Sequence, residues 1–205
     1  MKIKVCGLRE PDNIQAVVAL QPDYIGLICY DKSPRFIDDL SAEAVSNLSQ
    51  SIIKTGVFVN ESAEEIERLI ANYGLGAIQL HGSETPHFCV RFKGKVQVIK
   101  AFGVDGDFDF NQLDAYTDVV DLFLFDTKTA VHGGSGKTFD WDILKNYTGN
   151  VPFMLSGGIG PDNIAEATAV NHPQFYGVDL NSRFETEPGI KNIEALQKAF
   201  NTIRN

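Results

Sequence analysis

The stretch KIKVCGLREPDNIQAVVALQPDYIGLI at residues 2–28 sets the pattern that the rest of the chain repeats. A short β-rich run at 2–6 is followed by an amphipathic segment at 11–19 that opens with Pro11, and then by a second β-rich run at 23–28. Proline is favoured in the first turn of a helix. The stretch therefore predicts strand, helix and strand, the unit that joins parallel strands through a crossover.

The same alternation continues to the end of the 205 residues. Further β-rich runs lie at 54–59, 76–81, 95–101, 120–126, 151–156 and 175–179. Further helices are expected at 41–50, 62–72, 85–93, 109–117, 140–147, 161–170 and 190–203. Eight such units predict one domain over residues 1–205, folded as an α/β protein of the (β/α)8 TIM barrel type. The alternative is an open doubly wound sheet, but the first turn reads CGLREPDN and lacks the GxGxxG fingerprint of that fold.

Composition and charge narrow the classes of function. The formal net charge of −9, without a cluster of Lys or Arg, argues against nucleic acid or an anionic membrane surface as partner. The chain has no apolar run of about 18 residues and no signal-peptide pattern, so we expect a cytoplasmic protein. Three cysteines without a CxxC pair indicate neither a disulfide framework nor a structural zinc site.

In a barrel of this type the chemistry lies at the carboxyl ends of the strands. Cys6 ends the first β-rich run and Asp126 ends the sixth. A thiol and a carboxyl are both able to transfer protons. Taken singly, Cys6 could equally be a buried structural thiol and Asp126 a turn cap, so the pair needs support from the rest of the sequence.

That support comes from a set of motifs in order along almost the whole chain. They are KVCGLRE at 4–10, KSPRF at 32–36, GVFVN at 56–60, QLHG at 79–82, FDT at 125–127, GGSGKTFDW at 133–141, LSGGI at 155–159 and GVDLNS at 177–182. In order and spacing the chain resembles the phosphoribosylanthranilate isomerase family of tryptophan biosynthesis. Eight motifs in sequence are far more specific than any one of them.

The resemblance implies a reaction and two catalytic residues. The family carries out an Amadori rearrangement, in which the aminoaldose N-(5-phosphoribosyl)anthranilate becomes a 1-amino-1-deoxyribulose phosphate. By position, Cys6 matches the family's general base and Asp126 its general acid. No cofactor and no metal are expected, because the rearrangement involves proton transfer without net redox change.

The resemblance also implies how the two ends of a small phosphosugar substrate are held. Arg35 matches the residue that binds the anthranilate carboxylate, and a guanidinium suits a planar carboxylate. His81 is expected to contact the substrate, although a structural histidine would look the same in sequence. Backbone donors for the phosphate are expected from Gly134, Gly136, Gly157, Gly158, Asn181 and Ser182.

Some points stay open at the level of sequence. Arg183 replaces a small residue of the family pattern and could contact the phosphate or point to solvent. A metal-dependent sugar phosphate epimerase is disfavoured because only one of the four histidines, His81, ends a strand. A barrel that binds the ligand without turnover is disfavoured by the presence of both Cys6 and Asp126. The oligomeric state cannot be predicted.

Overall fold

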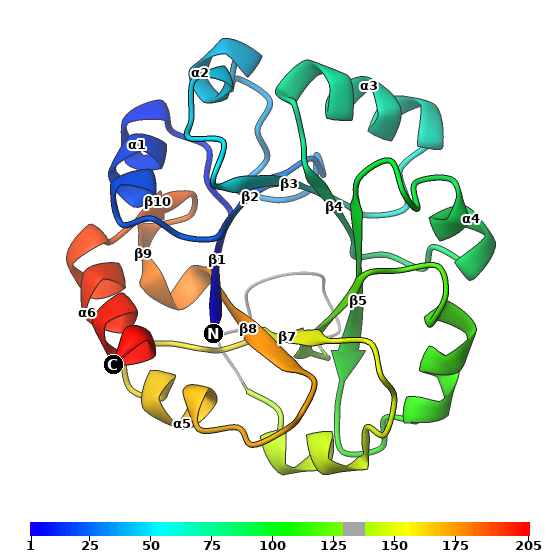
Figure 1. Ribbon diagram of the computed structural model, residues 1–205. Helices are drawn as coiled ribbons and strands as arrows, with labels where there is room; N and C mark the ends of the chain where they lie inside the picture. The colour runs from blue at the N-terminus through cyan, green and yellow to red at the C-terminus, as the bar shows by residue number, and fades with distance from the viewer. Residues whose placement is uncertain (129–137) are drawn as a thin grey trace.

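The computed structural model describes residues 1–128 and 138–205. Within these residues eight parallel strands pair in chain order, and β1 also pairs with β8, so that the sheet closes into a barrel (Figure 1). The strands are β1 (Lys2–Cys6), β2 (Tyr24–Ile28), β3 (Ile53–Phe58), β4 (Ala77–Leu80), β5 (Gln97–Val104), β6 (Leu122–Thr127), β7 (Phe153–Leu155) and β8 (Phe175–Leu180). The closed ring confirms the predicted (β/α)8 barrel and rules out the open sheet.

Helical segments surround the barrel on its outside (Figure 1). The α-helices are α1 (Pro11–Ala19), α2 (Ala42–Ser46), α3 (Ala63–Tyr73), α4 (Pro86–Val90), α5 (Ile164–Thr168) and α6 (Ile193–Arg204). The 3-10 helices are η1 (Phe110–Tyr116), η2 (Trp141–Asn146) and η3 (Ser182–Phe184). The helices predicted at 41–50, 85–93 and 161–170 are thus much shorter than expected, and those predicted at 109–117 and 140–147 are 3-10 rather than α.

Side chains that compete for the backbone explain part of this difference. The Asp109 carboxylate accepts a hydrogen bond from the backbone N–H of Asn111 at 3.0 Å, and Asp140 does the same for Asp142 at 3.0 Å. Such contacts favour tight turns over a regular α-helix. By contrast, α3 has an ordinary start, because the Ser62 hydroxyl accepts a hydrogen bond from the N–H of Glu65 at 3.2 Å.

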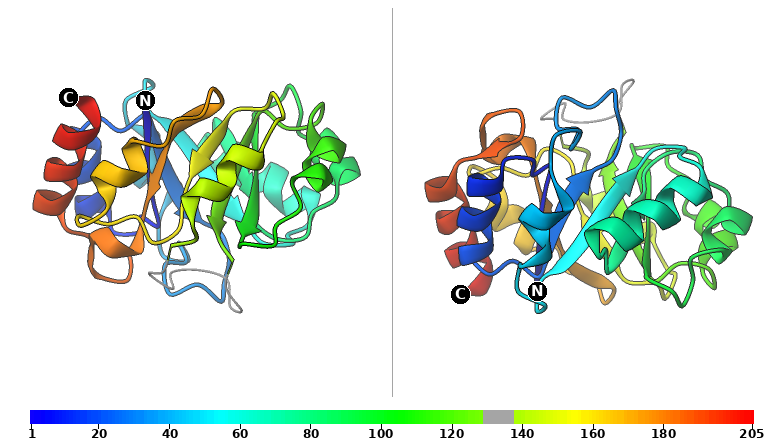
Figure 2. Two further views of the ribbon diagram at one scale, coloured as in Figure 1. Left: turned by 90° about the horizontal axis from the view of Figure 1, so that it is seen from below. Right: turned by 90° about the horizontal axis from the view of Figure 1, so that it is seen from above.

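The last unit differs most from the prediction. The helix expected at 190–203 begins only at Ile193, after Asn192 caps it with a hydrogen bond from the N–H of Ala195 at 3.0 Å. The residues before it form a small antiparallel pair, β9 (Glu185–Glu187) and β10 (Ile190–Lys191). This hairpin follows β8 and lies, like the connection between β2 and α2, at the end of the barrel away from the N-terminus (Figure 2).

The alternation of side chains along each strand produces two separate apolar layers. An inner cluster fills the barrel and consists of Tyr24, Ala77, Ile99, Ala101, Leu122, Leu124 and Met154. A larger outer cluster packs between the strands and the helices, with Ile3, Val5, Phe123, Phe125 and Phe153 among its members. A position on a strand therefore faces either the helices or the barrel interior, and this decides which residues can reach the site.

In the described part of the chain, no helix has both the length and the apolar character needed to cross a membrane.

Phe153 tests the outer layer. Its ring is fully buried and lies 5.0 Å, between centroids, from Phe125 and 5.9 Å from Tyr147. Phe153→Ala should lower the free energy of unfolding by about 3–5 kcal/mol, because it leaves a cavity among these rings. Urea denaturation measures the loss. The control is Val90→Ala, at a side chain that is 52% exposed, which should change stability by less than about 0.5 kcal/mol. Equal effects would contradict the packing.

Candidate active site

A pocket opens at the end of the barrel where the strands terminate. Its space, including open solvent, is about 870 Å³, which suits a small molecule. The side chains and backbone that line it come from seven strands or the loops after them, and include Cys6, Ile28, Tyr30, Val57, Gln79, His81, Asp126, Thr127, Ser156, Gly157, Gly158, Asp179, Asn181 and Ser182. Of the ten site residues expected from the sequence, seven therefore line one pocket.

Strand alternation explains how Cys6 and Asp126 reach this pocket. On β1, Ile3 and Val5 belong to the outer cluster, so Cys6 faces the interior. On β6, Phe123 and Phe125 belong to the outer cluster. Asp126, the second-last residue of the strand, therefore faces the interior. The two strands are three positions apart in the ring. The thiol and the carboxylate thus approach the same space from different sides.

Cys6 is enclosed at the bottom of the site, with only 3% of its surface exposed. Its sulfur lies against Gly26 of the neighbouring strand, where an added Cβ would come within 2.6 Å of Sγ. Burial raises the pKa of the thiol above its ordinary value. The ammonium of Lys4 lowers this pKa, the carboxylate of Asp179 raises it and the ammonium of Lys191 lowers it, and burial prevails.

A buried ion pair supports the floor of the pocket next to Cys6. The Nζ of Lys4 donates to Oδ1 of Asp179 at 2.9 Å, and both side chains are almost fully buried. The second carboxylate oxygen, Oδ2, accepts from the hydroxyl of Ser156 at 3.2 Å. Because a buried charge is tolerated only when it is paired, these partners hold one another in fixed positions.

Asp126 has a different environment, since its side chain is 22% exposed to the pocket. Its Oδ1 accepts from the backbone N–H of Thr127 at 2.8 Å, and its Oδ2 lies 3.4 Å from Nε2 of His81. The amide of Gln79 donates to Nδ1 of His81 at 2.7 Å, which leaves the hydrogen on Nε2, directed at the carboxylate. His81 and Asp126 therefore form one polar unit.

The expected phosphate donors that lie within residues 1–128 and 138–205 form two groups. Gly157 and Gly158 follow β7 with φ angles of 84° and 65°, a conformation that favours glycine. A Cβ on Gly157 would lie 2.5 Å from Oδ1 of Asp126, so this turn packs directly against the carboxylate. Asn181 and Ser182 follow β8 and line the same pocket.

Three of the expected residues need separate mention. Gly134 and Gly136 lie outside the residues that the structure describes. Arg35 is not among the residues that line the pocket, yet its Cδ lies 2.7 Å from the position of a Cβ on Gly7, directly after Cys6. Arg183, left open by the sequence, binds Oδ1 of Asp162 at 2.8 Å and the carbonyl of Gly158 at 3.1 Å.

Several polar residues of the site were not singled out from the sequence. Gln79, Thr127 and Asp179 lie in the motifs QLHG, FDT and GVDLNS, but the sequence alone assigned none of them a role of its own. Lys4 carried the clearest signal, because an inward-facing lysine in a short barrel strand needs a buried partner.

Within residues 1–128 and 138–205, no group of three or more His, Cys, Asp or Glu side chains is arranged to hold a metal ion.

Comparison with known proteins agrees with this geometry. The family model described as N-(5'-phosphoribosyl)anthranilate (PRA) isomerase matches residues 3–202. An N-(5'-phosphoribosyl)anthranilate isomerase of Parabacteroides distasonis is 44% identical over 99% of this chain and 93% of that protein. One from Phocaeicola vulgatus is 42% identical over 100% of this chain and 98% of that protein.

Solved structures give the same result. The crystal structure of phosphoribosyl anthranilate isomerase from Thermotoga maritima superposes with a TM-score of 0.87 at 32% identity, covering 100% of this chain and 98% of the other. A structure of this kind of enzyme in complex with reduced 1-(o-carboxyphenylamino)-1-deoxyribulose 5-phosphate has a TM-score of 0.84 at 29% identity, with the same coverage of both chains. Matching motifs, a matching barrel and full-length similarity lead to one conclusion: the chain belongs to the N-(5'-phosphoribosyl)anthranilate isomerase family.

Proposed function

We propose that this protein catalyses the Amadori rearrangement of N-(5'-phosphoribosyl)anthranilate in tryptophan biosynthesis, with Cys6 as general base and Asp126 as general acid. The observation that carries the proposal is that a thiol on β1 and a carboxyl on β6 line one pocket, which also contains glycine turns and polar side chains. The reaction is an aldose to ketose isomerisation within one molecule. A test of activity is the loss of substrate fluorescence when the purified protein is added.

Asp126 begins the reaction by opening the ribose ring. Its protonated carboxyl donates to the ring oxygen, the bond from C1 to that oxygen breaks, and the nitrogen lone pair forms an iminium at C1. The N–H at Nε2 of His81, whose nitrogen lies 3.4 Å from Oδ2, then stabilises the carboxylate that results. His81 thus supports the acid and contacts the substrate without transferring the proton itself.

Cys6 carries out the second step. Its thiolate removes the proton from C2, the electron pair of that bond forms the double bond between C1 and C2, and the π electrons of the iminium return to nitrogen, which gives an enolamine. A proton then returns to C1 while the C2 hydroxyl loses its proton, which gives the ketone. Because burial raises the pKa of this thiol, a nearby positive charge is needed to stabilise the thiolate, and the ammonium of Lys4 supplies the larger share and that of Lys191 a smaller one.

The two ends of the substrate are held by different chemistry. Gly157, Gly158, Asn181 and Ser182 supply donors to the phosphate, and by the family resemblance Gly134 and Gly136 add to them. Arg35, beside Gly7, binds the anthranilate carboxylate at the other end. We expect no cofactor. Three free cysteines are consistent with a protein that acts in the reducing cytoplasm.

Loss of the base tests the role of Cys6. Cys6→Ser should lower kcat by about two orders of magnitude or more and change KM only a few-fold, because a hydroxyl at this position is a much weaker base. Steady-state fluorescence assays measure both constants. Cys89→Ser, at a buried thiol within α4 and outside the pocket, is the matched control and should keep normal kcat and KM. Near-normal turnover in Cys6→Ser would remove this residue from the mechanism.

Loss of the acid tests Asp126. Asp126→Asn preserves the size of the side chain but removes the transferable proton, so ring opening should fall by about two orders of magnitude or more in kcat. Single-turnover fluorescence follows this step. Asp118→Asn is the matched control, since Asp118 is exposed and lies outside the pocket. A full burst of product from Asp126→Asn would assign the acid role to another group.

The charges around the thiol can be tested by titration. Lys4→Met removes a positive charge and should raise the pKa of Cys6, whereas Asp179→Asn removes a negative charge and should lower it. The pH dependence of alkylation by iodoacetamide, read on the Cys6 peptide by mass spectrometry, gives both midpoints. Cys89, whose burial raises its pKa to about 11, is the internal control and should not shift. Shifts in the same direction in both variants would contradict this arrangement.

A further inference from the structure

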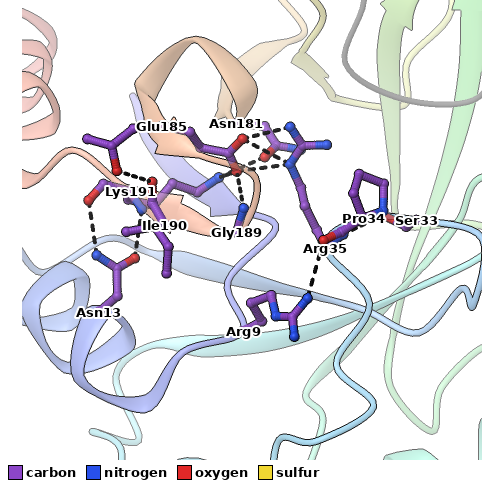
Figure 3. Close-up of polar contacts among 11 residues, drawn as sticks. Arg9, Asn13, Ser33, Pro34, Arg35, Asn181, Glu185, Gly189, Ile190 and Lys191 are labelled. Atoms are coloured by element: carbon purple, nitrogen blue, oxygen red, sulfur yellow. Dashed lines mark hydrogen bonds and ion pairs between the residues drawn. The ribbon is translucent and has the colours of Figure 1, made fainter.

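A buried carboxylate fixes the position of Arg35. Arg35 follows β2 and the carboxylate follows β8, the two strands that flank β1 in the barrel. Arg35 lies in the connection between β2 and α2, and its partner, Glu185, is the first residue of β9, 150 positions later in the chain. The Nε of Arg35 donates to the two carboxylate oxygens at 2.9 and 3.0 Å, and Nη2 donates to Oε2 at 2.6 Å. Figure 3 shows the two side chains meeting edge to edge. This bidentate contact sets both the position and the plane of the guanidinium.

Glu185 is itself held from several sides. Its Oε1 accepts from Nζ of Lys191 on β10 and from the backbone N–H of Gly189 at 3.2 Å, and its side chain is 4% exposed. Burial alone would raise the pKa of Glu185, but hydrogen bonds and charge from Arg35 and Lys191 hold it below its ordinary value. The carboxylate is therefore ionised and rigid at neutral pH.

The same cluster reaches the pocket and the rest of the fold. Lys191 also donates from Nζ to Oδ1 of Asn181, a pocket residue, at 2.7 Å. Its backbone is fixed to α1, because its N–H donates to Oδ1 of Asn13 at 2.8 Å and its carbonyl accepts from Nδ2 of Asn13 at 3.0 Å (Figure 3). Arg35 is thus anchored through Glu185 and Lys191 to the barrel.

The contact leaves one side of the guanidinium available. Among the residues that the structure describes, Nη1 of Arg35 has no hydrogen-bond partner, whereas Nε and Nη2 are directed at Glu185. With both cations protonated, Arg35, Lys191 and Glu185 carry one positive charge in excess. Burial lowers the pKa of Lys191 below its ordinary value, although the adjacent carboxylate of Glu185 acts in the opposite direction and raises it. One further carboxylate, from a ligand, would neutralise this excess positive charge.

We propose that Glu185 is a positioning residue for substrate binding: it fixes the Arg35 guanidinium so that the free Nη1 edge receives the carboxylate of the substrate's arylamine. The inference rests on the proposed function and deepens it, because it assigns recognition of that carboxylate to a buried pair of residues and not to Arg35 alone. Glu185 acts through Arg35 and does not touch the reacting atoms. Its loss should therefore affect binding and leave the chemical steps almost unchanged.

A double-mutant cycle tests this coupling. Glu185→Gln keeps the size of the side chain but removes its charge, and should raise KM at least 10-fold while kcat stays within about 3-fold. Arg35→Ala should raise KM by more. The variant with both changes should match Arg35→Ala within about two-fold, because no guanidinium is then left for Glu185 to position. The control is Glu187→Gln on the same strand, β9, where the side chain is exposed; its kinetics should be normal.

Two results would overturn the inference. One is a KM that rises by the same factor whether Arg35 is present or replaced, which is the behaviour of a merely structural residue. The other is a fall in kcat at unchanged KM. If Glu185→Gln does not fold, Glu185→Asp takes its place in the cycle: it keeps the charge but is too short to bind Nε and Nη2 together, so a smaller rise in KM with the same dependence on Arg35 is expected. Absence of turnover in the wild type and in Glu187→Gln would instead refute the proposed function, and the inference with it.

Discussion

Pairing of β1 with β8 is the constraint on which the whole site depends. It places Lys4 beside Asp179 across the closing seam of the barrel. The ion pair between these two side chains, at 2.9 Å, is buried under the pocket and lies next to Cys6. If the sheet were open at this seam, the charges would lose their partners and the thiol would lose its surroundings. Closure of the barrel therefore also assembles the floor of the candidate site.

Because side chains alternate along each strand, one set of residues packs against the helices and the other faces the barrel interior. Successive residues of β6 illustrate this: Phe125 packs against the helices, while Asp126 faces the pocket. The outer layer of aromatic rings is large enough to stabilise the barrel, so the inward positions at the strand ends are free to be polar. A single shift of register would exchange the two sets.

The sequence was sufficient to predict the barrel and to place Cys6 and Asp126 at strand ends that line one pocket, because strand periodicity and strand ends are local features and the motifs are arranged in a fixed order. It was less informative about the helices, since η1 and η2 depend on side chains such as Asp109 that compete for backbone groups. Glu185 could not be found in this way. Its partner Arg35 is 150 residues distant, and the contact exists only once the barrel has closed.

In the proposed mechanism, Cys6 removes the proton from C2 of a substrate whose ring has been opened by Asp126. Substrate carrying deuterium at C2 tests this most directly, with the label followed by mass spectrometry in recovered substrate and product. We expect the wild type to release the deuterium from C2, whereas Cys6→Ala should return substrate with the label in place. Release of deuterium by Cys6→Ala at the wild-type rate would contradict it.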